Sequence, residues 1–298
     1  MVKLKRTVTL FQAVMYCLSI ILGAGIYVLI GVAAQHAGNV TWLAFIFAAL
    51  IAATTGLSYA ELTSKLPFDA AEDLFTKKAF NNKSFSFGIG WLKIITLTIA
   101  MAAVSLGFGH YLSEIIPVHF LIGAIFILVF AVGVNTLSVK GTMKFGSFFV
   151  LLTILGLLLI VVSGAGHIGS VDLLDFTFGW EGIFTAAALI FFAFLGFEDI
   201  GSLGEEAKNP QKVLPRAIII SVLVATILYG LVSMVAISVV PWNQLDGGSS
   251  LSQVAGVTMG STGSMVISFI ALAATASTVI ILLFSVSRMI FGMAERKS

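Results

Sequence analysis

Two short stretches place groups that can bind a ligand inside long apolar runs. Gly23-Ala24-Gly25 interrupts the first apolar run, and Gly196 interrupts an aromatic run that is followed by Glu198 and Asp199. In lipid an unpaired backbone amide is costly, so broken backbone persists only against protein or a water-filled cavity. The amides and carbonyls freed at these two breaks are therefore candidate ligand-binding groups.

Each stretch also has a simpler structural interpretation. Small residues let helices approach closely in membranes, although that packing usually places glycines four residues apart and Gly23 and Gly25 are two apart. An intramembrane carboxylate such as Glu198 either marks a functional site or serves the fold. The structural role would be to accept hydrogen bonds from the broken helix or to lie near Lys208 and Lys212 at the interface. For Asp199 we expect the structural role.

The composition indicates what must position these groups. Of 298 residues, 59% are hydrophobic and 10% charged, against about 25% charged in a soluble domain. We therefore predict an all-α integral membrane protein, because apolar runs of about 20 residues cross a bilayer as helices. Eight such runs lie at about 10–34, 41–65, 87–116, 119–136, 145–164, 182–204, 214–240 and 262–292.

Charge placement predicts the topology. With the N-terminus inside, all 16 Lys and Arg fall on the cytoplasmic side, whereas the four histidines fall in or near the opposite loops. We therefore expect a multi-pass protein of the cell membrane with both termini cytoplasmic. Lys93 lies just inside the third run, and we expect its ammonium to reach the cytoplasmic interface along a buried stem.

Several kinds of function are disfavoured. Cys17 is the single cysteine, so a disulfide framework and a Cys-based metal site are excluded. We find no His/Glu metal-ligand spacing and no nucleophile–base pair, so we do not expect an enzyme. The expected partners are a small substrate and the lipid bilayer, with no nucleic acid.

The two breaks are related by their positions in the chain. They fall in the first and sixth runs, five apart and opposite in direction, which is typical of an inverted repeat of five spans. Residues 1–164 would form the first repeat, and 165–298 an incomplete second repeat of spans 6–8. Helix N-termini suit a carboxylate, and freed carbonyls suit an ammonium or a sodium ion. A site that offers both suits a zwitterion.

The order of several motifs resembles the amino acid–polyamine–organocation (APC) permease superfamily, with the fold of the bacterial leucine transporter. The resemblance implies a secondary transporter of amino acids that works by alternating access, as a symporter or an exchanger. The motifs are "SIILGAGIYVLIG" (19–31), "SYAELTSKLP" (58–67), "FFAFLGFED" (191–199), "EEAKNPQKVLPRAI" (205–218) and "SRMIFGMA" (287–294).

This resemblance implies a substrate site at the two breaks. Main-chain groups at the first break would hold the carboxylate, carbonyls at the second the α-amine, and Phe194 or a neighbouring aromatic would act as a gate. Small residues of span 3, around 101–105, would line the side-chain pocket and favour a neutral amino acid. Glu198 keeps a cationic amino acid or a polyamine as the alternative. The implied residues are Ile21, Gly23, Ala24, Gly25, Ala102, Ser105, Phe192, Ala193, Phe194, Leu195 and Glu198.

The coupling ion is left open between sodium and a proton. Some proton-coupled relatives place a lysine in span 5, where this chain has Thr153. Ala274, Ser277 and Thr278 share one helix face, and the resemblance adds the carbonyls of Ser19 and Leu22 as ligands of a possible Na+. Alternatively, the hydroxyls simply hydrogen-bond carbonyls within their helix. No other cofactor is expected.

The number of spans departs from the family. The inverted repeat comprises two sets of five spans, and the eighth span ends near residue 292. We therefore expect either a truncated, non-transporting chain or a subunit that needs a partner polypeptide to supply the missing helices. The oligomeric state is not predicted.

Overall fold

The computed structural model describes residues 8–65, 72–137, 139–198, 200, 207–245 and 247–295. Within these ranges the chain is helical, and its only β-type pairing is an isolated bridge between Val8 and Ala207. The α-helices are α1 (Leu10–Ile21), α2 (Gly25–Ala37), α3 (Thr41–Lys65), α4 (Glu72–Phe80), α5 (Lys83–Ser113), α6 (Phe120–Leu137), α7 (Val139–Gly164), α8 (Gly179–Phe191), α9 (Pro210–Val239) and α10 (Ser250–Glu295). Short 3-10 helices are η1 (Gly38–Val40), η2 (Ala165–His167), η3 (Phe192–Phe194) and η5 (Trp242–Gln244).

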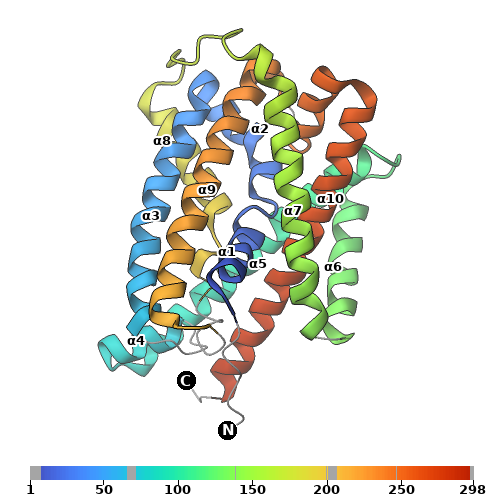
Figure 1. Cartoon of the computed structure of the whole chain (residues 1–298). Coiled ribbons are helices and arrows are strands. Elements are labelled where there is room, and N and C mark those ends of the chain that lie inside the picture. The colour runs from blue at the N-terminus through green and yellow to red at the C-terminus, as the bar shows by residue number, and fades with distance from the viewer. Residues whose placement is uncertain are drawn as a thin grey trace.

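The long helices stand side by side as a bundle (Figure 1). Large apolar side chains cover the outside of this bundle, as expected where the surrounding solvent is lipid. Examples from six helices are Leu50, Ile99, Ile125, Val162, Leu223 and Phe269. The prediction of an all-α membrane protein is therefore confirmed.

The helices account for the eight predicted spans, with two differences. α4 forms where a connection was expected between spans 2 and 3. The segment before the last span is also helical, because α10 comprises two helices joined at Gly260, whose φ is 73°, and the first of them starts at Ser250. Both additions are short polar or kinked segments, whose local pattern does not distinguish a helix from a loop.

α1 and α2 form the centre of the fold. Figure 1 shows them between the α3–α9 side and the α7–α10 side of the bundle. Residues 17–27 are all buried. Local sequence determines where α1 begins, because Thr9 and Gln12 form a reciprocal capping box in which each side chain accepts a backbone hydrogen bond from the other residue.

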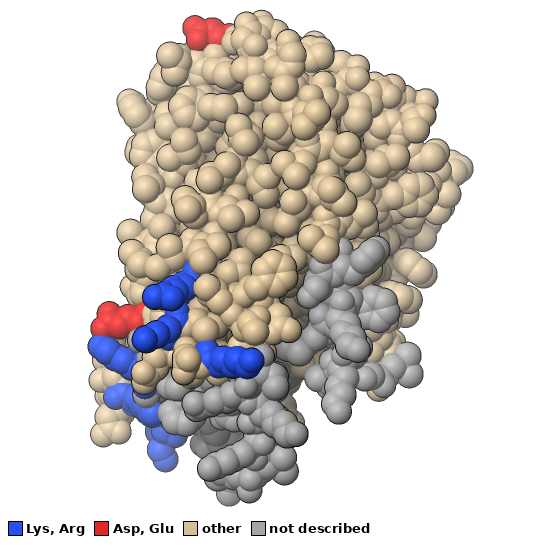
Figure 2. All heavy atoms as spheres, in the orientation of Figure 1, with Lys and Arg blue, Asp and Glu red and all other residues tan. Residues whose placement is uncertain are grey.

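Basic side chains gather at one end of the molecule (Figure 2). This end includes the neighbourhood of α4 and the starts of α5 and α9. The predicted segregation of charge also involved Lys3, Lys5, Arg6, Arg296 and Lys297, which lie outside the described residues. The side chains of Lys140, Lys144 and Arg288 are likewise outside the part that the structure describes.

Candidate functional site

The two predicted breaks are present in the chain path. α1 ends at Ile21, and α2 begins only at Gly25, with Leu22 at φ −78° and ψ 8° between them. α8 and η3 end at Phe194, after which Leu195 is extended (ψ 147°) and Gly196 has φ 115°. An L side chain rarely adopts such a positive φ, so glycine is needed at Gly196.

Glycines allow the two breaks to touch each other. A Cβ at Gly25 would lie 2.4 Å from the Cα of Ala193 and 2.5 Å from its Cβ. A Cβ at Gly196 would lie 2.1 Å from Cγ2 of Ile20. Because carbon atoms normally pack about 3.5–4.0 Å apart, only glycine permits this approach. The sequence pattern at each break therefore brings the breaks together.

The helix α10 packs against the first break. A Cβ at Gly23 would lie 2.0 Å from Oγ1 of Thr278, so α10 packs directly against the backbone between α1 and α2. The Thr278 hydroxyl donates to the Ala274 carbonyl at 2.9 Å. α10 therefore contributes a polar side chain at the break without leaving that hydroxyl unsatisfied.

The backbone amides and carbonyls at the two breaks differ in their hydrogen-bond partners. The first amides of α2 have no acceptor within their own helix, as at every helix N-terminus. The Ile21 carbonyl accepts a hydrogen bond from Oη of Tyr229 at 2.6 Å, and the Ala193 carbonyl lies 3.3 Å from the same oxygen. Tyr229 is fully buried on α9. Its one hydroxyl thus connects a carbonyl from each break.

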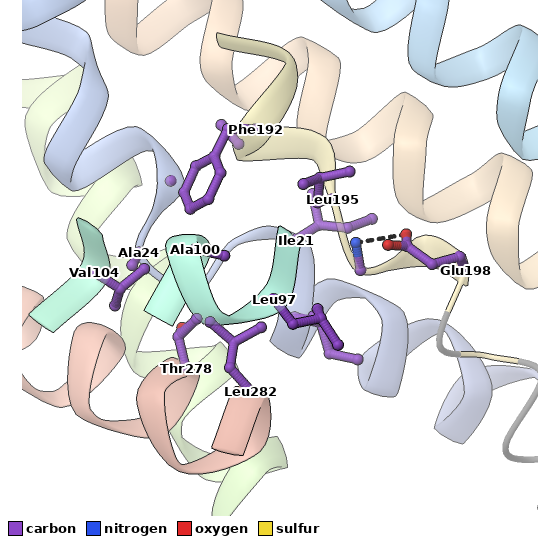
Figure 3. Close-up of a pocket in the computed structure, with 14 residues that line it drawn as sticks. Ile21, Ala24, Leu97, Ala100, Val104, Phe192, Leu195, Glu198, Thr278 and Leu282 are labelled. Carbon is purple, nitrogen blue, oxygen red and sulfur yellow. Dashed lines mark hydrogen bonds between the residues drawn. The ribbon is translucent and has the colours of Figure 1, made fainter. Parts of the chain in front are cut away.

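A small cavity of about 30 Å³ lies between the breaks. That volume is large enough for about two water molecules, whereas ligand pockets usually measure about 300–1,000 Å³. In Figure 3, Phe192 and Leu195 lie on one side of it, with Leu97, Thr278 and Leu282 on the other. Seven predicted substrate residues line it: Ile21, Ala24, Gly25, Phe192, Ala193, Leu195 and Glu198.

Four predicted substrate residues do not line this cavity. Gly23 lies at the break against Thr278, and Ala102 is exposed on the outer side of α5. The Ser105 hydroxyl donates to the Met101 carbonyl at 2.7 Å. Phe194 is buried against the ring of Tyr229, with 5.3 Å between ring centroids. Phe192 is the neighbouring aromatic that lines the cavity.

The cavity-facing side of α5 differs from the predicted one. Leu97, Ala100 and Val104 line the cavity, spaced three and four residues apart as one helix face requires. The other lining residues that were not predicted are Ile20 and Leu282, whereas Gly196, which also lines the cavity, was predicted as the second break. The apolar pattern of α5 continues all round the helix, so it contains no signal for which face meets α2 and α10.

The hydroxyls of the predicted cation site are engaged within their own helices. Ser277 and Thr278 both donate to the Ala274 carbonyl, at 2.8 and 2.9 Å. The Ser19 hydroxyl donates to the Tyr16 carbonyl at 2.6 Å. Leu22 is buried. Among the described residues, no group of three or more His, Cys, Asp or Glu side chains is placed to hold a metal ion.

The predicted coupling position in span 5 also makes local hydrogen bonds. The Thr153 hydroxyl donates to the Phe149 carbonyl at 2.8 Å, and the Thr153 carbonyl accepts from the hydroxyl of Tyr27 at 3.2 Å. Thr153 is buried on α7. Its side chain therefore links α7 to itself, and its carbonyl links α7 to α2.

Glu198 is held at the edge of the cavity by two donors. Its Oε1 lies 2.7 Å from Nζ of Lys93, and its Oε2 accepts a hydrogen bond from the Gly196 amide at 2.7 Å (Figure 3). The second contact is the structural role considered above, because it satisfies an amide of the broken helix. Lys93 differs from the expectation, because its ammonium binds Glu198 inside the bundle. Asp199 lies outside the described residues.

Comparison with known proteins shows that the chain is similar to membrane transporters. The chain is 34% identical over 266 residues to the branched-chain amino acid permease BcaP of Bacillus subtilis, covering 82% of this chain and 57% of that protein. It is 29% identical over 313 residues to the methylthioribose transporter of Bacillus subtilis, covering 98% of this chain and 68% of that protein. It is 30% identical over 300 residues to cationic amino acid transporter 4 of Homo sapiens, covering 91% of this chain and 47% of that protein.

The chain therefore spans about half to two thirds of the length of these relatives. The sequence profile described as amino acid permease matches residues 8–297, nearly the whole chain. With two contacting helix breaks in a membrane bundle, this match shows that the chain belongs to the amino acid permease family of the APC superfamily.

Proposed function

We propose that this chain forms the substrate-binding part of a secondary transporter that carries a neutral amino acid across the cell membrane by alternating access. The observation that carries the proposal is the contact between two helix breaks over a mostly apolar cavity. Backbone breaks inside a membrane bundle are tolerated where they are buried or line a cavity, and they commonly form transporter sites.

The ends of the substrate would bind main-chain groups of opposite polarity. The N-terminus of α2 offers free amides and a positive dipole end for the carboxylate. Of the three predicted carbonyls, that of Phe192 already accepts the Leu195 amide at 3.2 Å, so the α-amine would bind those of Ala193 and Leu195. Because Tyr229 already reaches the carbonyls of Ile21 and Ala193, a bound ammonium would share these acceptors with its hydroxyl.

The side-chain pocket favours an aliphatic substrate. Ile20, Leu97, Val104 and Leu282 contribute apolar surface, and Ala100 leaves room between them. This lining is consistent with the similarity to BcaP of Bacillus subtilis, which is named a branched-chain amino acid permease. Since the cavity measures about 30 Å³, the surrounding helices must move apart to admit an amino acid. Such movement is expected of alternating access.

The second candidate substrate is a cationic amino acid or a polyamine. Glu198 lines the cavity, and several relatives carry the name cationic amino acid transporter. However, the carboxylate already has an ammonium partner in Lys93. We therefore favour the neutral substrate.

Coupling to sodium or to a proton is the second part of the proposal. Thr278 on the cavity wall and Thr153 in place of a span-5 lysine are consistent with sodium. The engaged hydroxyls of Ser277 and Thr278 are consistent with a purely structural role. Uptake into sodium-free, pH-clamped vesicles separates these cases, because undiminished uptake there excludes sodium coupling.

Orientation in the membrane is proposed from charge. The described basic residues gather at one end of the bundle (Figure 2), and Lys and Arg are retained in the cytoplasm. We therefore place both termini in the cytoplasm.

A binding screen tests the proposed function. The purified chain is heated with each of the twenty amino acids in turn, with and without sodium. Binding to the folded state stabilises it by about 2.7 kcal/mol when the ligand is at 100 times its Kd. We expect leucine, isoleucine and valine to raise the unfolding midpoint. A flat response to all twenty would contradict the proposal and favour a chain that needs a partner polypeptide.

A further inference from the structure

The bundle contains a largely buried ion pair between α5 and the second break. Nζ of Lys93 lies 2.7 Å from Oε1 of Glu198, and the two side chains are only 14% and 6% exposed. Lys93 is ten residues into α5, about 15 Å along the axis at 1.5 Å per residue. Charged side chains at such a depth are costly and usually functional.

The pair is in register with the cavity. Lys93 precedes Leu97, Ala100 and Val104 by four, seven and eleven residues, so it continues the cavity-facing side of α5 by one turn. Glu198 itself lines the cavity. The carboxylate therefore lies between the cavity and the lysine turn, with Lys93 as its partner on one oxygen and the Gly196 amide on the other.

This arrangement neutralises the one described carboxylate that lines the cavity. A ligand ammonium or guanidinium that approached Glu198 would meet the positive charge of Lys93 beside it. Like charges placed side by side exclude wrong partners at a binding site. A ligand with an uncharged side chain meets no such opposition.

We propose that Lys93 is a specificity-determining residue that acts as an internal counter-ion of Glu198 and thereby restricts the site to amino acids with uncharged side chains. This inference rests on the proposed function. Without Lys93, Glu198 becomes available to a cationic substrate side chain. Without Glu198, no carboxylate beside the cavity offsets the positive charge of Lys93, and this charge then favours an anionic side chain.

The two single substitutions should therefore favour ligands of opposite charge. Lys93→Met removes the ammonium while keeping an unbranched stem of similar length. We expect the ratio of lysine to leucine affinity to rise by about tenfold or more. Glu198→Gln leaves the cation, and we expect the ratio of glutamate to leucine affinity to rise instead.

The experiment measures equilibrium binding of radiolabelled leucine, lysine and glutamate to the purified full chain. It compares wild type, both single variants, the double variant K93M/E198Q, and Lys83→Ala. Lys83 begins the same helix and is exposed, so its variant controls for loss of one positive charge from α5. We expect wild type and Lys83→Ala to prefer leucine, and the double variant to show neither gain.

Several results would overturn the inference. One is an unchanged lysine-to-leucine ratio in Lys93→Met, and another is the same gain in the double variant, since that gain would not act through Glu198. If Lys93→Met does not fold, Glu198→Gln provides the test. An unchanged ratio of glutamate to leucine affinity in that variant would then overturn the inference. Wild type that prefers lysine to leucine refutes the inference without any variant. Wild type that binds no amino acid refutes the proposed function instead.

Discussion

Gly25→Ala tests the contact between the two helix breaks. The added Cβ would lie 2.4 Å from the Cα of Ala193 and 2.5 Å from its Cβ. Because carbon atoms pack about 3.5–4.0 Å apart, α2 and η3 must separate by roughly 1 Å. The obstacle is backbone, which cannot rotate away as the end of a long side chain can. Overpacking of this kind costs about 1–3 kcal/mol, so we expect the free energy of unfolding to fall by that amount.

The same displacement should weaken ligand binding. The proposed carboxylate and amine sites are on opposite sides of the contact, so a shift of about 1 Å would change the distance between them. We expect leucine affinity to fall at least about tenfold, which corresponds to 1.4 kcal/mol. Thermal unfolding and equilibrium leucine binding measure the two effects on the same preparation.

A matched glycine provides the control. Gly133 lies inside α6 with no atom within 4 Å of an added Cβ. Alanine is favoured over glycine within helices by about 1 kcal/mol, so Gly133→Ala should leave stability unchanged or slightly raised, with unchanged leucine affinity. Wild-type stability and affinity in Gly25→Ala would refute the reasoning, because the two breaks would then not be in close contact.

Three further substitutions test other parts of the site. Tyr229→Phe removes the donor to the buried Ile21 carbonyl, so we expect stability to fall by about 1–3 kcal/mol and leucine affinity to fall. The hydroxyl of Tyr111 donates to the Tyr27 carbonyl away from the cavity, so Tyr111→Phe should lower stability without lowering leucine affinity. An equal loss of leucine affinity in Tyr111→Phe and Tyr229→Phe would contradict the role of Tyr229. Thr278→Val should raise the sodium concentration needed for half-maximal leucine binding, whereas identical sodium curves would exclude Thr278 as a sodium ligand. Gly196→Ala places a Cβ at φ 115° against Ile20, so we expect lower thermal stability, and an unchanged unfolding midpoint would show that the backbone there tolerates an L side chain.

The helix breaks were predictable because their signal is local. Gly23 and Gly25 are two residues apart rather than four, and Gly196 is followed by the charged Glu198 within an apolar run. A single glycine is not such a signal, because Gly133 lies inside the uninterrupted helix α6. Seven of the predicted substrate residues line the cavity for the same reason, since they lie on the broken segments themselves. Main-chain chemistry at a break depends little on how neighbouring helices are rotated.

Contacts between separate helices were not predictable from these patterns. Tyr229 is the lone tyrosine of an apolar run, and nothing in that run shows that its hydroxyl reaches Ile21 and Ala193. Lys93 was expected to extend toward the interface, because a lysine stem favours that arrangement when no buried anion is near. Its true partner, Glu198, is 105 residues away in the chain. The rotation of α5 about its own axis also depends on the helices around it. They place Leu97 rather than Ala102 toward the cavity.

The central claim is that peptide groups at the two breaks hold both ends of a zwitterion. Its most direct measurement compares the affinity of the purified chain for leucine, leucinamide and 4-methylpentanoate, which keep the same aliphatic side chain. Leucinamide lacks the carboxylate, and 4-methylpentanoate lacks the ammonium. Since hydrogen bonds to charged groups contribute about 1.5–3 kcal/mol each, we predict that either analogue binds at least about tenfold more weakly than leucine. Equal affinity for all three compounds would contradict the account.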